Sequence, residues 1–187
     1  MDPGGKTQEG NPNLPVGAGK NGFRSLQKVA EAAWPPSSGA AKAADPWGSA
    51  KASRWMSAQG QSVVRAGLAA WTKLKEEDKA TPRERAVLVT GVEGAWPGWL
   101  KGRSPQEIAQ EWRTQPPLWL LEGLPNLPAA QLAIEITARG PVESRRGRPE
   151  DDLASCSSME RWTRRGIRRL LWVRWNRAQA CAEVWSS

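Results

Sequence analysis

Tryptophan provides nearly all the aromatic surface of this 187-residue chain, which contains 12 Trp, one Phe, no Tyr and no His. A folded core normally draws on Phe and Tyr as well as Trp, and no packing argument favours indole while excluding phenol. The bias therefore indicates a constraint on the nucleotide sequence, as in a recently born reading frame or one that overlaps another gene. Such an origin favours a small accessory or regulatory protein over an ancient enzyme fold.

The absence of histidine and the small number of cysteines limit the chemistry of the chain. Ser-His and Cys-His catalytic pairs are excluded because there is no His. The two cysteines, Cys156 and Cys181, make neither a disulfide framework nor a complete Cys-only zinc site. Residues 4–7, Gly-Gly-Lys-Thr, resemble the end of a phosphate-binding loop but leave no room for its earlier glycine and preceding strand. We therefore expect no enzyme, no cofactor or metal and no small-molecule substrate.

The charge of the chain predicts an anionic partner. Its formal net charge is +8 and its pI is about 10.1, values that favour nucleic acid, an acidic protein or an anionic membrane surface. No apolar stretch approaches the ~20 residues of a membrane span, and residues 1–22 lack the basic and apolar regions of a secretory signal. We therefore expect a protein of the cytoplasm or nucleus that is neither secreted nor transmembrane.

The N-terminal third, residues 1–52, is predicted to be disordered. Residues 1–22 are polar and rich in Gly, Pro and Asn, so they cannot bury enough apolar surface to offset the entropy of ordering. A short helix is predicted at 24–33, where apolar residues share one helical face before two prolines stop it. Residues 35–52 have the Ala-, Gly-, Ser- and Pro-rich composition that is typical of a linker.

Residues 53–187 are predicted to form a helical domain, so the expected fold class is mainly α. Apolar residues recur every three to four positions in its first helix, where Gly60 and Gly67 each cost about 1 kcal/mol of helix stability. Residues 129–138 also alternate as a strand would, but a lone strand has no partner to pair with, which favours helix. The predicted core residues are Trp55, Val64, Leu68, Trp71, Val87, Leu88, Ile108, Trp112, Leu120, Leu132, Ile134, Leu170 and Val173.

Three capping boxes mark predicted helix starts. Residues 81–84 (Thr-Pro-Arg-Glu) and 104–107 (Ser-Pro-Gln-Glu) place Pro at the first helical position, and residues 157–160 (Ser-Ser-Met-Glu) form a box without Pro. In such a box the hydroxyl accepts a hydrogen bond from the N–H three residues on, and the Glu reaches back to the N–H of the cap. The predicted helices span 53–79, 82–90, 105–114, 129–138 and 158–184.

The sharpest candidate for a working surface is a long basic amphipathic helix at 158–184. At 100° per residue its apolar side chains gather on one side and its arginines on the other, with Trp172 and Trp175 on the arginine side. Guanidinium groups bind phosphate in a bidentate manner, and an adjacent indole stacks on an unpaired base for about 1–3 kcal/mol. The predicted nucleic-acid-binding residues are Arg161, Arg164, Arg165, Arg168, Arg169, Trp172 and Trp175.

Other interpretations of this face stay open. Arginine beside indole also suits an anionic membrane surface, where indole lies at headgroup depth. Alternatively, the arginines form a solvated helix face and both tryptophans pack beneath other helices. Upstream, leucines recur every third residue, which is the spacing of either a nuclear export signal or a core segment. These leucines are Leu118, Leu121, Leu124 and Leu127.

In size, basic charge and Trp excess the chain resembles overprinted viral accessory proteins, such as the paramyxovirus C proteins and the lentiviral Rev proteins. Residues 161–177 resemble a Rev-type RNA-binding helix, although Leu170, Leu171 and Val173 interrupt the arginines. The resemblance implies a non-enzymatic viral regulator that binds nucleic acid, with RNA favoured, and modulates replication or host innate defence. The alternatives are an interferon antagonist that binds a host protein without nucleic-acid affinity, and a protein of anionic membrane surfaces.

Overall fold

The computed structural model describes residues 26–35, 44–48, 50–94, 98–115, 118–146, 152–176 and 178–187. The strands are β1 (Gln27–Trp34), β2 (Arg85–Thr90), β3 (Val142–Arg145), β4 (Arg169–Asn176) and β5 (Gln179–Ser186). The helices are α1 (Ala50–Ser53), α2 (Ala58–Trp71), α3 (Pro105–Glu111), α4 (Leu127–Glu135) and α5 (Asp152–Arg164). Short 3-10 turns lie at Glu76–Asp78, Pro82–Glu84, Gly98–Leu100, Trp112–Thr114 and Trp119–Gly123.

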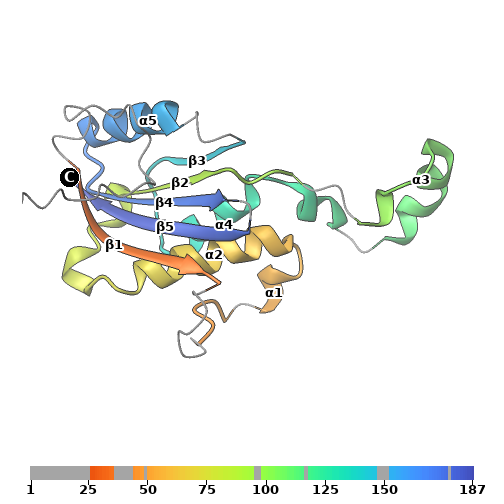
Figure 1. Ribbon diagram of the computed structural model, residues 1–187, viewed down its shortest axis with the longest axis horizontal. Helices are drawn as coiled ribbons and strands as arrows, with labels where there is room; N and C mark the ends of the chain where they lie inside the picture. Colours follow the sequence, from red (N-terminus) through yellow and green to blue (C-terminus); the bar gives the residue numbers. More distant parts are fainter. Residues whose placement is uncertain are drawn as a thin grey trace, which may run out of the picture.

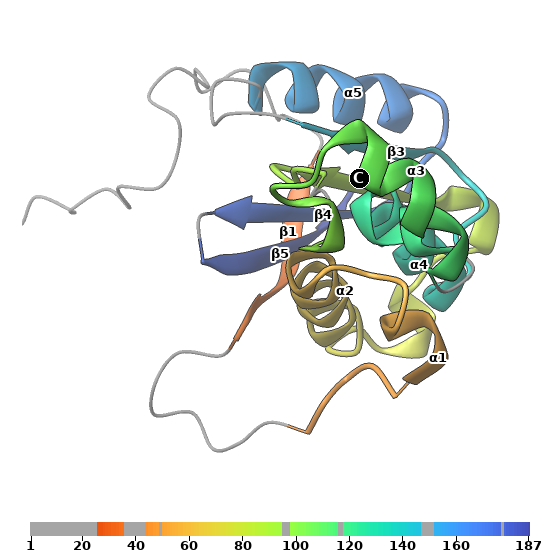
Figure 2. The same ribbon diagram turned by 90° about the vertical axis from the view of Figure 1, so that its right-hand side faces the viewer.

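The five strands form one mixed sheet in the order β1-β5-β4-β2-β3. β4, β2 and β3 run parallel, whereas β5 runs antiparallel to both of its neighbours, β4 and β1. α2 and α4 cover one face of the sheet and α5 covers the other (Figure 1, Figure 2). The prediction of a mainly α fold was therefore wrong, because the chain forms a three-layer α/β fold whose helices connect parallel strands.

The central strands β2 and β4 are covered on both faces. In β2, Val87 packs toward α2 and α4 while Leu88 packs toward α5, and both side chains are fully buried. β4 divides in the same way, with Val173 on the first side and Trp172 on the second. A strand buried on both faces has a continuous apolar run instead of alternation, which periodicity alone does not separate from a helix.

The prediction of a long basic helix at 158–184 was wrong, because a strand that is buried on both faces has the continuous apolar run that a helix can also have. α5 ends at Arg164, Gly166 turns the chain with a φ of 91°, and β4 and β5 follow as an antiparallel pair. The capping box at 157–160 lies inside α5 and not at its start. Likewise, the helix predicted at 82–90 is a single 3-10 turn followed by β2.

The N-terminal third also departs from the prediction of disorder over 1–52. β1 pairs with β5 where the sequence predicted a helix at 24–33. Trp47, within the predicted linker, is buried, and its Nε1 donates a hydrogen bond to Glu135 Oε1 at 3.0 Å. The phosphate-loop-like segment and most of the remaining predicted disorder lie outside the described residues. The ranges outside are 1–25, 36–43 and position 49.

Three predicted helices are confirmed as α2, α3 and α4, which form in or next to the stretches 53–79, 105–114 and 129–138. The capping box at the start of α3 is complete. Ser104 Oγ accepts from the Glu107 N–H at 3.3 Å, and Glu107 Oε2 accepts from the Ser104 N–H at 2.7 Å. Local cap chemistry therefore predicted this helix start correctly.

The segment between β2 and α4, referred to below as the arm, extends away from the sheet and carries α3 (Figure 1). Two predicted core residues lie on it with exposed side chains, Trp112 at 47% and Leu120 at 59%. Ile134 on α4, also predicted as core, is 68% exposed. Leu118 and Leu124 of the arm are exposed as well. Leu121 and Leu127, the other two regularly spaced leucines, are half-buried, and an export role for the four stays a prediction.

Gly60 and Gly67 set the close contact between α2 and α4. A Cβ at Gly60 would lie 3.0 Å from Pro128 Cγ, and one at Gly67 would lie 2.6 Å from Leu132 Cδ2. The two glycines are two helical turns apart, so they lie on the same face of α2. Glycine at these two positions thus lowers helix stability, but it allows α2 and α4 to pack closely on one side of the sheet.

We predict that Gly67→Val lowers the free energy of unfolding by about 1–3 kcal/mol, because the valine would overlap Leu132 and force the helices apart. Ala69→Val on the same helix is the control, since position 69 is only half-buried and this variant loses mainly helix propensity. Thermal unfolding followed by circular dichroism compares them. Equal melting temperatures for the two variants would contradict the close contact of α2 with α4.

We also predict that the carboxyl of Glu84 titrates below its ordinary pKa. The backbone N–H and the hydroxyl of Thr81 both donate to Glu84 Oε2, at 3.0 and 2.9 Å, and this holds the pKa of Glu84 down. Because the charged form is favoured in the folded state, the stabilisation is present above the unfolded pKa and is lost as pH falls through the folded one.

Thr81→Ala should raise the pKa of Glu84 toward its ordinary value, because it removes the hydroxyl donor. The pKa of Glu107, lowered by the matching hydrogen bonds from Ser104, should stay where it is and serves as the internal control. Carboxyl carbon shifts measured by NMR over an acid titration report both groups. An equal pKa of Glu84 in the unmodified protein and in Thr81→Ala would contradict the assignment of the Thr81 hydroxyl as a cause of the lowered pKa.

Candidate nucleic-acid interface

The amino ends of the parallel strands β2, β3 and β4 meet at one edge of the sheet, and arginines gather there. Backbone hydrogen bonds join the three segments that lead into these strands: the Arg139 N–H donates to the Pro82 carbonyl at 2.7 Å, and the Arg168 N–H donates to the Glu84 carbonyl at 3.0 Å. These segments therefore lie side by side. The exposed arginines of this place, referred to as the basic edge, are Arg83, Arg139, Arg164, Arg165 and Arg168.

Gly140 allows the three segments to approach closely. Its N–H donates to the Arg85 carbonyl at 3.1 Å. A Cβ at this position would lie 2.4 Å from the Arg85 oxygen, 2.9 Å from Ile167 Cδ1 and 3.2 Å from the Arg83 oxygen. No side chain fits between these groups without displacing backbone, so the arrangement of the basic edge depends on this glycine.

Few carboxylates neutralise the basic edge. Arg168 Nε lies 3.2 Å from Glu84 Oε1 and Arg164 Nη2 lies 3.4 Å from Glu160 Oε2, but the two arginine side chains are 69% and 78% exposed. Ion pairs this exposed contribute little, because water screens them. The arginines of the edge that form no ion pair with another described residue are Arg83, Arg139 and Arg165. The edge therefore presents a surplus of positive charge.

α5 extends this surface by one turn. Arg161 and Arg164 are exposed on its outer side, whereas Met159 and Trp162 are buried against the sheet. Arg161 Nη2 donates to Ser158 Oγ at 3.1 Å, which orients its guanidinium along the helix. The outer side of α5 thus continues the row of arginines that begins in the turn before β4.

The structure separates the predicted site residues. Four of them, Arg161, Arg164, Arg165 and Arg168, lie together at the end of α5 and in the turn after it. Arg169 is half-buried, and its guanidinium instead donates to the Asp78 carbonyl and to the Ser186 hydroxyl. Trp172 and Trp175 point to opposite faces of the sheet, since residues three apart on a strand do so.

The two tryptophans are packed in the fold. Trp172 is 5% exposed beneath α5, its Nε1 donates to Thr90 Oγ1 at 3.2 Å, and the Arg174 guanidinium lies 4.6 Å from its ring centroid. Trp175 is half-buried on the side of α2, and its Nε1 donates to the Gln59 side-chain oxygen at 2.8 Å once that amide is oriented to suit both of its neighbours. The expected stacking of Trp172 on an unpaired base therefore does not fit its place in the core.

Sequence reasoning missed Arg83 and Arg139, which lie beside Arg168 at the basic edge. Each comes shortly before a strand, β2 or β3, and parallel strands place their amino ends at the same edge. Recognising β2 and β3 as parallel strands would have placed these arginines together. The continuous apolar run of β2 did not allow this, because periodicity does not separate a buried strand from a helix.

The opposite edge of the sheet holds the carboxyl ends of the parallel strands, where open α/β sheets bind ligands. β2, β3 and β4 end there at Thr90, Arg145 and Asn176, none of which is a carboxylate. Arg145 is held by Glu143 at 2.5 Å and donates to Ser158 Oγ at 2.8 Å. Within the described ranges, no group of three or more His, Cys, Asp or Glu could hold a metal ion.

Comparisons with known proteins give a likeness of fold. The chain matches no protein-family model and no curated protein. Among solved structures it is similar to one chain of the complex between the ketosynthase ApeO and its chain length factor ApeC from Xenorhabdus doucetiae, with a TM-score of 0.55 and 13% identity. That match covers 87% of this chain and 79% of the other, and it supports the α/β arrangement and nothing finer. No described helix is both long and apolar enough to cross a membrane.

We predict that Trp172→Ala lowers the free energy of unfolding by about 3–5 kcal/mol, because it leaves a cavity beneath α5 and an unused hydroxyl at Thr90. Arg165→Gln is the exposed control and should change stability by less than about 0.5 kcal/mol. Urea denaturation monitored by circular dichroism measures both. A Trp172→Ala protein as stable as the control would show that this indole is not part of the core.

Proposed function

We propose that this chain is a small, non-enzymatic regulatory protein that binds nucleic acid, RNA in the first place, through the basic edge and the adjoining face of α5. The observation that carries the proposal is the gathering of exposed arginines from three separate segments at one place. Arg83 comes from before β2, Arg139 from before β3, and four more from α5 and the turn after it. Clustering of Arg on one face of a basic domain is the electrostatic footprint of a nucleic-acid-binding protein.

Electrostatics support an anionic polymer as the partner. The formal net charge of +8 attracts nucleic acid over a distance, and guanidinium groups bind phosphate oxygens in a bidentate manner. Each neutralised phosphate releases counterions, so binding of this kind is strong at low salt and weakens steeply as salt rises. The weakly paired arginines of the basic edge can exchange their exposed carboxylate partners for phosphate at little cost.

The arrangement favours contacts to the backbone over contacts to bases. The two indoles expected to stack, Trp172 and Trp175, are engaged with Thr90 and Gln59 inside the fold. Phosphate contacts position a protein without reading sequence. We therefore expect little sequence preference, and binding to duplex as well as single-stranded RNA.

The wider role follows from the composition. A reading frame that overlaps another gene would explain the Trp excess, and the basic edge would give such a viral accessory protein a means of holding RNA in the host cytoplasm or nucleus. Modulation of replication or of host innate defence is then the regulatory outcome. Binding of a host protein or of an anionic membrane in place of RNA are the competing outcomes that the next experiment separates.

The test measures affinity for a short mixed-sequence RNA, as duplex and as single strand, by fluorescence anisotropy over a range of salt. Arg165→Gln combined with Arg168→Gln should weaken binding and flatten the plot of log affinity against log salt by about 0.7–0.9 per lost phosphate contact. Scrambling the RNA sequence should leave the affinity unchanged.

The matched control is Lys101→Gln combined with Arg113→Gln, which removes the same charge from exposed positions on the arm. It should leave the salt slope close to that of the unmodified protein. Equal flattening in both double variants would show that net charge alone drives binding. A protein that binds anionic vesicles and not RNA at low salt, or neither, would overturn the proposal and leave a membrane or a host protein as partner.

A further inference from the structure

Two arginines from different elements meet at one buried hydroxyl beside α5. Arg145, the last residue of β3, donates from Nη2 to Ser158 Oγ at 2.8 Å, and Arg161 on α5 donates from its own Nη2 to the same oxygen at 3.1 Å. Ser158 is 2% exposed. A buried oxygen that accepts from both side chains thus fixes two guanidinium groups next to each other. Arg145 and Arg161 are referred to below as the arginine pair.

The arginine pair carries more positive than negative charge. Arg145 Nε lies 2.5 Å from Glu143 Oε1, so one carboxylate accompanies Arg145. Glu160, the neighbouring carboxylate on α5, lies 3.4 Å from Arg164 instead, and Arg161 forms no ion pair with any described residue. Two like charges held this close repel each other. An anion placed between the two guanidinium groups would therefore be attracted by both.

The arginine pair keeps hydrogen-bond donors for such an anion. A guanidinium group has five N–H donors in a planar fork, and among the described residues no acceptor is bonded to Arg145 Nη1 or to Arg161 Nε and Nη1. The side chain of Arg145 is 23% exposed and that of Arg161 is exposed, so a ligand can reach both. The fork of each group matches the spacing of two phosphate oxygens.

α5 connects the arginine pair with the basic edge. The helix runs from the side of β3 to the turn before β4, so its end at Arg164 adjoins the basic edge. Arg165 follows Ser158 by about two helical turns, or roughly 10 Å along the axis. Arg164 lies on the exposed side of α5 between these two places. A strand of nucleic acid bound at the basic edge would reach the arginine pair along this helix.

We propose that the arginine pair is a phosphate-binding site, with one guanidinium on each side of the phosphate and Ser158 as the residue that positions both. In a role that rests on the function proposed above, it holds one phosphodiester of a nucleic-acid strand whose following phosphates lie along Arg164 toward the basic edge. Free inorganic phosphate has the same chemistry, and the two experiments below separate these two sources.

The first experiment titrates the full chain with inorganic phosphate at constant ionic strength and follows the Nε–H signals of arginine by NMR. The signals of Arg145 and Arg161 should shift saturably with one common affinity, because one anion contacts both. Ser158→Ala keeps every charge but removes the hydroxyl that aligns the two groups, so it should weaken this binding about tenfold. Ser62→Ala is the control, because its hydroxyl on α2 donates to the Ala58 carbonyl, and it should leave the affinity unchanged.

The second experiment measures RNA affinity by fluorescence anisotropy. Arg161→Lys keeps the charge but removes the planar fork, so it should weaken RNA binding about tenfold while the salt slope stays nearly the same. Arg145→Gln combined with Arg161→Gln should weaken binding by less than the product of the two single losses, because both side chains contact one phosphate.

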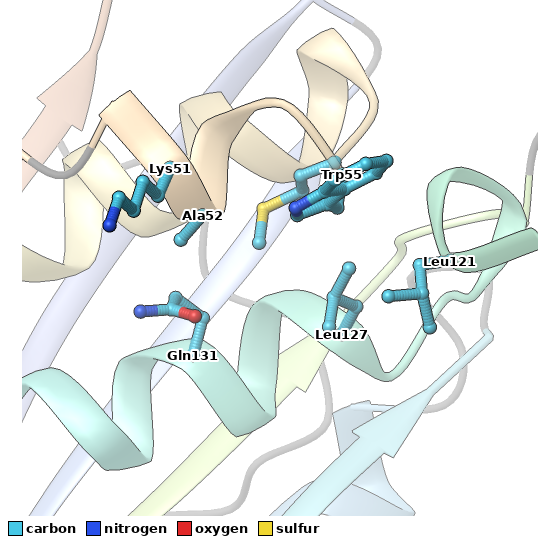
Figure 3. A pocket seen from close by; sticks show the side chains of 7 residues that line it. Lys51, Ala52, Trp55, Leu121, Leu127 and Gln131 are labelled. Carbon is cyan, nitrogen blue, oxygen red and sulfur yellow. The ribbon is translucent and has the colours of Figure 1, made fainter. Parts of the chain in front are cut away.

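Lys51→Gln is the control for charge alone. Lys51 lies on α1 beside an open hollow of about 320 Å³ between α1, α4 and the arm, which Figure 3 shows. α1 packs with α2 and α4, on the side of the sheet opposite α5. Lys51→Gln should therefore weaken RNA binding much less than Arg161→Gln does.

The outcomes separate this site from the function of the basic edge. Weaker RNA binding in Arg161→Lys without a phosphate shift assigns the arginine pair to nucleic-acid phosphate, and a phosphate shift alone assigns it to free phosphate. A protein that binds phosphate here but no RNA at all would count against the proposed function only. RNA binding that Arg161→Lys leaves unchanged, together with no saturable phosphate shift, would overturn the phosphate site and leave the basic edge intact. Equal losses in Lys51→Gln and Arg161→Gln, or unrelated phosphate affinities at the two arginines, would also overturn it.

Discussion

Burial of the parallel strands β2 and β4 between two helical layers is the constraint on which the rest of the structure depends. Their backbone groups are closed off on both faces, so they can be satisfied only by neighbouring strands, which fixes β3 and β5 beside them. The direction of these strands then determines which side chains meet at each end of the sheet. Their amino ends gather the arginines of the basic edge, and the crossover to α4 begins at the carboxyl end of β2.

The sequence revealed the local features of this fold but not its sheet. The cap at Ser104 and Glu107 acts within a few residues, so the start of α3 could be predicted. The box at 81–84 has the same pattern of a hydroxyl, a Pro and a Glu, yet only one turn follows it, because Val87 and Leu88 are buried on opposite faces of a strand. Burial in the tertiary structure outweighs a helix cap when the apolar run after the cap can pack against helices on both faces of a sheet. No local sequence pattern indicates that outcome.

The candidate site was half predictable for the same reason. Arg164 and Arg165 are adjacent in the chain, so their charge stands out in any reading of the sequence. Arg83 and Arg139 join them only because β2 and β3 run parallel to β4, which is a fact of topology. The prediction that Trp172 binds nucleic acid was wrong for the opposite reason. A helical wheel places Trp172 beside arginines, whereas in the strand β4 it is buried beneath α5.

The tryptophan excess has a physical consequence for the polar groups of the core. Every buried indole brings an N–H that needs an acceptor, which Phe would not. The fold provides Glu135 for Trp47 and Thr90 for Trp172. By contrast, the buried Nε1 of Trp99, on the arm, has no acceptor among the described residues. The tryptophans thus use polar partners inside the fold, and the indole of Trp172 packs beneath α5 and not at the basic edge.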